Sequence, residues 1–99
     1  MDQPLTPDQF LPHVGQIFRV KGGRHALTLS RVEVHPLDDQ EAKRVPRAPF
    51  TVIFAGPPGD VLREGFHVLE REGGPAFELY VMPIQTFELG RQDYQAAFN

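Results

Sequence analysis

The sequence contains no cysteine, and this absence removes several kinds of chemistry at once. A chain without thiols forms no disulfide framework, holds no metal through thiolates and has no cysteine nucleophile. It also has no apolar run near the ~20 residues that span a bilayer. Its first ten residues, MDQPLTPDQF, lack the basic stretch and apolar segment of a secretory signal. We therefore expect a soluble, cytoplasmic protein without a membrane partner, although export within a larger assembly would leave no mark.

Positive charge is also scarce. The 10 lysines and arginines face 13 acidic residues, which gives a formal net charge of -3. The densest basic group is Lys43, Arg44 and Arg47, and acidic residues precede it in the same polar stretch. Nucleic-acid binding normally requires a basic face. We expect no nucleic-acid partner, and we interpret this stretch as a solvated loop of mixed charge.

The chain length and composition predict one small globular domain. Two cores in 99 residues would each fall below the size that folds unaided, so residues 1–99 form a single domain. Apolar residues at 40% and charged residues at 23% are ordinary globular values. The 10 prolines and 9 glycines separate the apolar runs, which predicts many short elements joined by turns.

The segment LTPDQFLPHVG predicts a short helix near the start of the chain. Thr6 can cap it, with Pro7 at the first helical position and Gln9 three residues after the cap. Pro12 should break it into a second turn, and Gly15 can end it. The residues at helical spacing, which we expect to pack inward, are Phe10, Leu11 and Val14.

After residue 15 the apolar period changes from helical to two, which is typical of strands. The expected strands are residues 16–21, 26–35, 50–56, 63–72, 76–84 and 93–99. Turns at Gly22–Gly23 and Gly73–Gly74 would join neighbouring strands as hairpins. In the second hairpin, the residues expected to share the apolar face are Phe66, Val68, Phe77, Leu79 and Val81. Six short strands and a leading helix predict a mainly β fold, a small antiparallel barrel or sandwich whose last strand closes or edges the sheet.

The strand region contains one irregular alternation and one long polar stretch. The apolar alternation slips by one residue between Leu29 and Val32, which predicts a bulge at Ser30 or Arg31. A strand buried on different faces along its length is the alternative. Residues 36–49 form the longest polar stretch, which we expect to be an exposed loop.

The sequence FAGPPGDVL begins like a phosphate-binding loop, but its continuation does not fit one. Such a loop requires a lysine for the phosphates and a hydroxyl for magnesium, and the residues after Gly56 supply neither. Consecutive prolines and Gly59 suit a turn that leaves a strand. We expect Asp60 to cap a single helical turn that ends at Gly65.

No constellation of residues points to catalysis or to a cofactor. The four histidines lack ligand spacing, and the only serine, Ser30, lies in a predicted strand. His35 with Asp38 and Asp39 is a weak candidate for a polar or metal site, since loop acids beside a surface histidine commonly occur by chance. A hydrolase or isomerase would need a cleft that holds His35 or His67 against a carboxylate. We predict a protein that is not an enzyme and has no catalytic residue, metal or cofactor.

The aromatic residues are abundant, with 8 phenylalanines in the chain. Most of them should form the core, but an aromatic residue exposed near a sheet edge would mark a docking patch. The terminal segment YQAAFN is the main candidate, because a terminal strand can pair with the sheet of another chain. The possible interface residues are Tyr94, Phe98 and Phe87.

Five short motifs resemble one family across nearly the whole chain. They are Phe10 to Phe18 with Gly15, Pro49 to Phe54, Leu62 to Phe66, Phe77 to Pro83, and Tyr94 to Asn99, where the chain closes as Y-x-A-x-F-N. They are similar to a family of bacterial proteins of about 100 residues that is classified only as a domain of unknown function. The resemblance implies a place in a phage-tail-like or other large assembly, and it supplies no catalytic residues.

These observations favour a non-enzymatic interaction or structural module. Such a module would dock on a protein partner, or on a second copy of itself, through a sheet edge or exposed aromatic residues. The alternative is a β domain that binds a small molecule in a pocket lined by phenylalanines.

Overall fold

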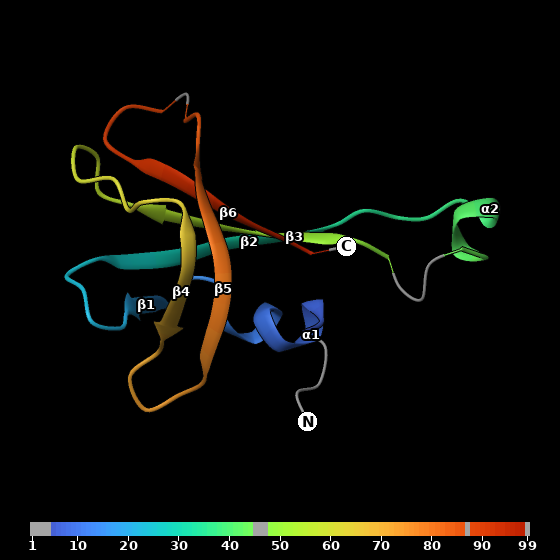
Figure 1. The fold of residues 1–99 in the computed structure, drawn as a ribbon, viewed down its shortest axis with the longest axis horizontal. Coiled ribbons are helices and arrows are strands. Elements are labelled where there is room, and N and C mark those ends of the chain that lie inside the picture. Colours follow the sequence, from blue (N-terminus) through green and yellow to red (C-terminus); the bar gives the residue numbers. More distant parts are fainter. Residues whose placement is uncertain (1–4, 45–47, 87, 99) are drawn as a thin grey trace.

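The computed structural model describes residues 5–44, 48–86 and 88–98. Its six strands close into an antiparallel barrel in the order β1-β2-β3-β6-β5-β4 (Figure 1). The strands are β1 (Ile17–Val20), β2 (Ala26–Val34), β3 (Phe50–Gly56), β4 (Gly65–Glu70), β5 (Ala76–Ile84) and β6 (Gln92–Phe98). Helix α1 (Pro7–Phe10) and the 3-10 helix η1 (Leu11–His13) precede them, and α2 (Asp39–Ala42) connects β2 to β3. The predicted small antiparallel barrel with a short N-terminal helix is confirmed.

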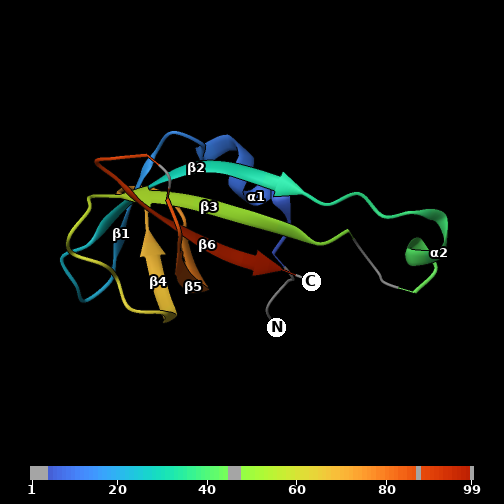
Figure 2. The ribbon, with the colours of Figure 1, turned by 90° about the horizontal axis from the view of Figure 1, so that it is seen from above.

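The barrel has two halves whose strands run in different directions. Strands β2, β3 and β6 run together, and β4 and β5 cross them (Figure 2). Strand β5 belongs to both halves, because Ala76–Val81 pair with β4 whereas Met82–Ile84 pair with β6. Pro83 has no backbone N–H to donate to a neighbouring strand. It is compatible with this position because β4 begins opposite Val81 and does not reach Pro83. Strand β6 therefore lies between β3 and β5, and it closes the barrel rather than edging a sheet.

The core is filled by the inward residues of every strand and by one residue of α1. The largest fully buried side chains are Tyr94, Phe10, Phe18, Phe50, Phe54, Leu27, Leu29, Leu69, Leu79, Val52 and Val81. The Phe10 ring centroid lies 4.6 Å from that of Phe77 in β5, 5.9 Å from Phe98 in β6 and 6.1 Å from Phe50 in β3. The Phe10 ring thus fills the barrel interior between the rings of β3, β5 and β6, where β5 and β6 no longer pair.

The predicted start of α1 is confirmed. The Thr6 backbone N–H donates to Gln9 Oε1 at 2.7 Å, and Pro7 occupies the first turn. Phe10 is buried, but Leu11 and Val14 are 49% and 43% exposed, so the expectation that they pack inward is wrong. The α-helix has a single turn, and the chain continues as η1 over Leu11–His13 and leaves helical geometry at Val14. The α-helical spacing that placed Leu11 and Val14 beside Phe10 therefore does not apply.

The bulge in β2 is also confirmed, since the β2–β3 register shifts between Leu29 and Arg31. Beyond it the two strands continue as a ribbon to the pair Val34 and Phe50. The described residues after β2 lead away from the barrel to α2 (Figure 1). They belong to the segment 36–49 predicted as a loop, of which residues 45–47 lie outside the described residues. Among the described residues, no helix is long and apolar enough to cross a membrane.

The helical turn predicted from Asp60 to Gly65 does not form, because Asp60 has a distant partner. Both carboxylate oxygens of Asp60 accept hydrogen bonds from Arg24, each at 2.8 Å. These bonds lower the pKa of Asp60 below its ordinary value. They also join the β1–β2 turn to the β3–β4 connection.

Candidate docking surface

Two aromatic rings project from the outer face of the β4–β5 hairpin. Phe66 lies directly opposite Tyr80 in the ladder, and the two side chains are 73% and 43% exposed. Their centroids are 5.0 Å apart and their planes meet at 77°, an edge-to-face contact. Such cross-strand pairs stabilise a hairpin and hold both rings in defined orientations. Phe66 is thus a large apolar side chain that is exposed to solvent and held in one orientation by Tyr80.

A carboxylate holds the outer end of this pair. The Tyr80 hydroxyl donates to Glu64 Oε2 at 2.5 Å. This hydrogen bond, assisted by partial desolvation and by the negative charge, raises the pKa of Tyr80 above its ordinary value. Because the hydroxyl is tethered, Tyr80 cannot rotate freely away from Phe66.

The same face of the hairpin is acidic. Val68 lies opposite Glu78, and Glu70 opposite Ala76, with all four side chains on the outward side. Strands β4 and β5 contribute no lysine or arginine. Arg19 of β1 pairs with Glu70 in the register, and Arg63 and Arg71 flank Glu64 and Glu70 in the sequence. We call this surface the aromatic face, and its residues are Glu64, Phe66, Val68, Glu70, Glu78 and Tyr80.

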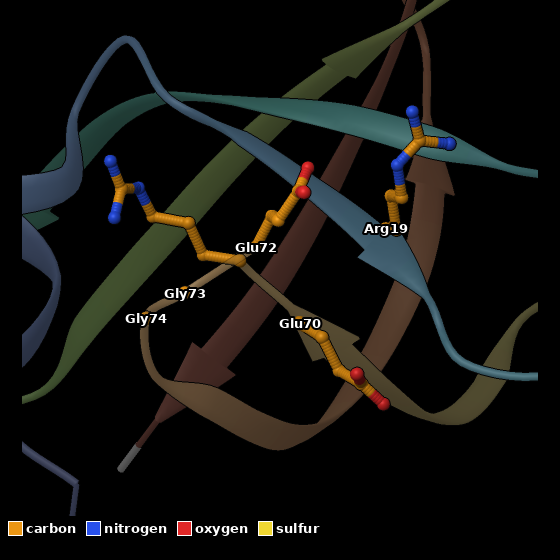
Figure 3. A pocket seen from close by; sticks show the side chains of 6 residues that line it. Arg19, Glu70, Glu72, Gly73 and Gly74 are labelled. Carbon is orange, nitrogen blue, oxygen red and sulfur yellow. The ribbon is translucent and has the colours of Figure 1, made fainter.

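A polar hollow of about 450 Å³ lies next to the aromatic face, where β1 meets the β4–β5 turn (Figure 3). Its lining residues are Arg19, Glu70, Arg71, Glu72, Gly73 and Gly74. Glu70 and Glu72 point to opposite sides of the chain, and Arg19 projects from the neighbouring strand (Figure 3). No phenylalanine lines this hollow, so the Phe-lined pocket of the sequence analysis stays a prediction.

The aromatic residues proposed from sequence occupy other positions. Tyr94 is only 1% exposed, and its hydroxyl accepts the backbone N–H of Leu62 at 2.9 Å. The expectation that Tyr94 is an exposed interface residue is therefore wrong. Phe98 is half-buried, and its ring stacks on Phe50 at 4.5 Å with an angle of 11°. Phe87 lies outside the described residues.

The polar candidates are not brought together. His35 Nε2 lies 3.1 Å from Thr51 Oγ1, so this side chain is bonded to β3. Asp38 and Asp39 are exposed at the beginning of α2. In the described part of the chain, no group of three or more histidine or acidic residues could hold a metal ion. His67, the other histidine considered for catalysis, donates through Nε2 to the Arg63 carbonyl at 2.7 Å.

Sequence reasoning missed the exposure of Phe66, although a signal was present. Residues directly opposite each other in a ladder share one face. With the turn at Gly73–Gly74, the inward residues Phe77 and Leu79 lie opposite Leu69 and His67. Phe66 must then point outward.

The chain belongs to the family of the domain of unknown function DUF6916, whose model matches residues 5–98. The prediction that the chain belongs to a family classified as a domain of unknown function is therefore confirmed. No curated protein and no solved structure shows a significant match to the chain.

Proposed function

We propose that this member of the DUF6916 family is a non-enzymatic protein-interaction module that docks a partner protein on its aromatic face. The observation that carries the proposal is the 73% exposure of Phe66. Protein interfaces are enriched in aromatic residues at their centres, and a few such residues supply most of the binding free energy. Phe66 and Tyr80 together form an anchor of this type.

The rigidity of the surface supports the same proposal. Phe66 and Tyr80 stand on paired strands, contact each other edge to face and are tied to Glu64 through the Tyr80 hydroxyl. Binding to a preorganised surface loses little conformational entropy, which leaves more of the contact energy as affinity.

The charges around the anchor favour a protein over a nucleic acid. Glu64 bonds to the Tyr80 hydroxyl, Glu78 follows in the next outward pair of the ladder, and carboxylates repel phosphate groups. The proposed partner is therefore a protein, and the cytoplasm stays the predicted compartment. We propose no catalytic role, because His35 and His67 are bonded to Thr51 and to a backbone carbonyl.

The test compares the substitution Phe66→Ser with Leu89→Ser, which removes an equally apolar, fully exposed side chain in the β5–β6 connection (102% exposed). Both variants should melt near the wild-type temperature, since surface changes typically alter stability by less than about 0.5 kcal/mol. Affinity capture from cell extract, quantified by mass spectrometry, should lose its enriched proteins with Phe66→Ser and retain them with Leu89→Ser. Equal capture by wild type and Phe66→Ser would show that the aromatic face is not the docking surface.

A further inference from the structure

One edge of β5 is not used by the barrel, and the hydrogen-bond pattern shows which residues lie on it. The Arg71 N–H donates to the Pro75 carbonyl at 3.0 Å at the end of the β4–β5 hairpin. In an antiparallel ladder, bonded residues alternate with residues whose N–H and C=O groups point the opposite way. Phe77, Leu79 and Val81 therefore bond to β4. The backbone groups of Ala76, Glu78 and Tyr80 point toward the other side of β5.

The strand on that other side does not reach these residues. In the described part of the chain, β6 pairs with β5 only at Met82, Pro83 and Ile84. Beyond this point β5 and β6 run apart, as both views show (Figures 1 and 2). Ala76, Glu78 and Tyr80 consequently present three backbone donors and three acceptors without a ladder partner. We call this segment, residues 76–80, the open edge of β5.

We propose that the open edge of β5 binds an extended segment of a partner protein as an added strand. Unpaired strand edges recognise extended peptides through backbone hydrogen bonds, and side-chain contacts supply the specificity. This inference rests on the proposed docking function, because residues opposite each other share a face. An added strand would therefore place its own outward side chains beside the aromatic face.

The charge of this face specifies the chemistry of the partner. Glu78 is exposed and lies opposite Val68, so no cation of β4 pairs with it, whereas Glu70 lies opposite Arg19 of β1. A lysine or arginine opposite Glu78 is therefore favourable, as opposite charges in cross-strand pairs are. An apolar or aromatic residue opposite Tyr80 would cover that ring and extend over Phe66. The partner segment thus alternates, with basic and apolar residues on its outward side.

The same charges disfavour a second copy of this chain as the occupant. Two copies joined through their open edges around a two-fold axis would form one continuous sheet. Their carboxylates at Glu64, Glu70 and Glu78 would then lie on one shared face, and like charges across strands are destabilising. A basic segment of a different protein meets no such repulsion.

The experiment uses two capped heptapeptides, TFVKVKT and its charge-reversed counterpart TFVEVET, in NMR titrations of the full chain. TFVKVKT should shift the amide signals of Ala76, Glu78 and Tyr80 and slow their hydrogen exchange. TFVEVET should bind roughly fivefold more weakly, because one of its glutamates lies opposite Glu78 and replaces a favourable charge pair by a repulsive one. No shift at millimolar TFVKVKT, or binding without protection of these three amides, would overturn the proposal.

Two substitutions at Glu78 test the edge directly. Glu78→Pro removes an N–H that the β4 ladder does not use, so the fold should persist while TFVKVKT binding is lost. If Glu78→Pro does not fold by circular dichroism, Glu78→Lys serves instead and should invert the preference between the two peptides. Wild-type binding by the folded Pro variant, or an unchanged preference in Glu78→Lys, contradicts strand addition.

The outcomes for this inference and for the docking function are separable. Loss of partner capture with Phe66→Ser but not with Glu78→Pro would leave the docking function standing and reject the added strand. Partner capture that survives Phe66→Ser and fails with Glu78→Pro would support the added strand and reject docking through the aromatic face. A peptide-free dimer in sedimentation that Glu78→Pro dissociates would identify a second copy as the occupant and overturn the choice of partner.

Discussion

The substitution Phe10→Ala is the sharpest test of how α1 contributes to the barrel. Phe10 is 0% exposed, and its ring contacts the rings of Phe77, Phe50 and Phe98 on three different strands. We expect the fold to survive but to lose a large part of its stability, because the strands around Phe10 cannot collapse into the space it leaves.

The magnitude follows from the burial of the ring. Replacing a fully buried phenylalanine by alanine removes its transfer free energy and leaves a cavity, which together cost about 3–5 kcal/mol. A domain of this size has a total stability of roughly 5–15 kcal/mol. Each kcal/mol lowers the melting temperature of a domain of 60–100 residues by roughly 4–8 °C. The melting temperature of the variant should fall by at least ~12 °C, from 3 kcal/mol at ~4 °C each.

Chemical denaturation followed by circular dichroism measures this change. The matched control is Leu11→Ala, which truncates the next residue, a side chain that is 49% exposed. The control should change the free energy of unfolding by less than about 0.5 kcal/mol. A loss below about 1 kcal/mol for Phe10→Ala, or equal losses for both variants, would refute the conclusion that α1 fills the barrel between its separated strands.

Three further predictions concern single groups. Tyr94→Phe removes the acceptor of the buried Leu62 N–H, so urea denaturation should show a loss of about 1–3 kcal/mol, and a neutral result would contradict that bond. Glu64→Gln should lower the raised pKa of Tyr80 toward its ordinary value, measured by phenolate absorbance. Because the fold favours the protonated hydroxyl, its contribution is present below the ordinary tyrosine pKa and is lost as pH rises through the higher folded value. Gly73→Ala places a side chain at φ +70° and should destabilise the protein by about 1–2 kcal/mol in thermal melts, whereas no change would argue against the turn geometry.

The elements that depend on local chemistry could be predicted from the sequence. The cap at Thr6, the turn at Gly73 and the bulge near Ser30 each follow from residues within a few positions of each other. The barrel class followed from the number and spacing of apolar alternations. These features are local because turn conformation and strand period depend on neighbouring side chains.

The predictions that were wrong concern residues whose partners lie far away in the sequence. Asp60 has the sequence of a helix cap, but Arg24, 36 positions away, offers two charge-assisted hydrogen bonds instead. Tyr94 lies in the last strand of the sequence, yet that strand inserts between β3 and β5, and both of these strands pair with β6 at Tyr94. Order along the chain does not reveal order in the sheet.

Phe66 was predicted to be buried because phenylalanine is more apolar than the adjacent His67. Neighbouring residues of a strand point to opposite faces, so a buried Phe66 would leave His67 on the solvent-exposed face. The ladder imposes the reverse, and His67 is satisfied by the Arg63 carbonyl at 2.7 Å. Strand register, which is fixed by the turn, outweighs the transfer preference of one side chain, and the phenylalanine left outside became the candidate docking residue.

The position of Phe10 also has a consequence for synthesis. A ribosome produces Phe10 early, but its contacts are Phe50, Phe77 and Phe98, which emerge progressively later. Phe10 in α1 therefore cannot be fully buried until β6 has been synthesised. Burial of the N-terminal segment is therefore a late event in folding, and nascent chains that lack β6 should remain sensitive to proteases.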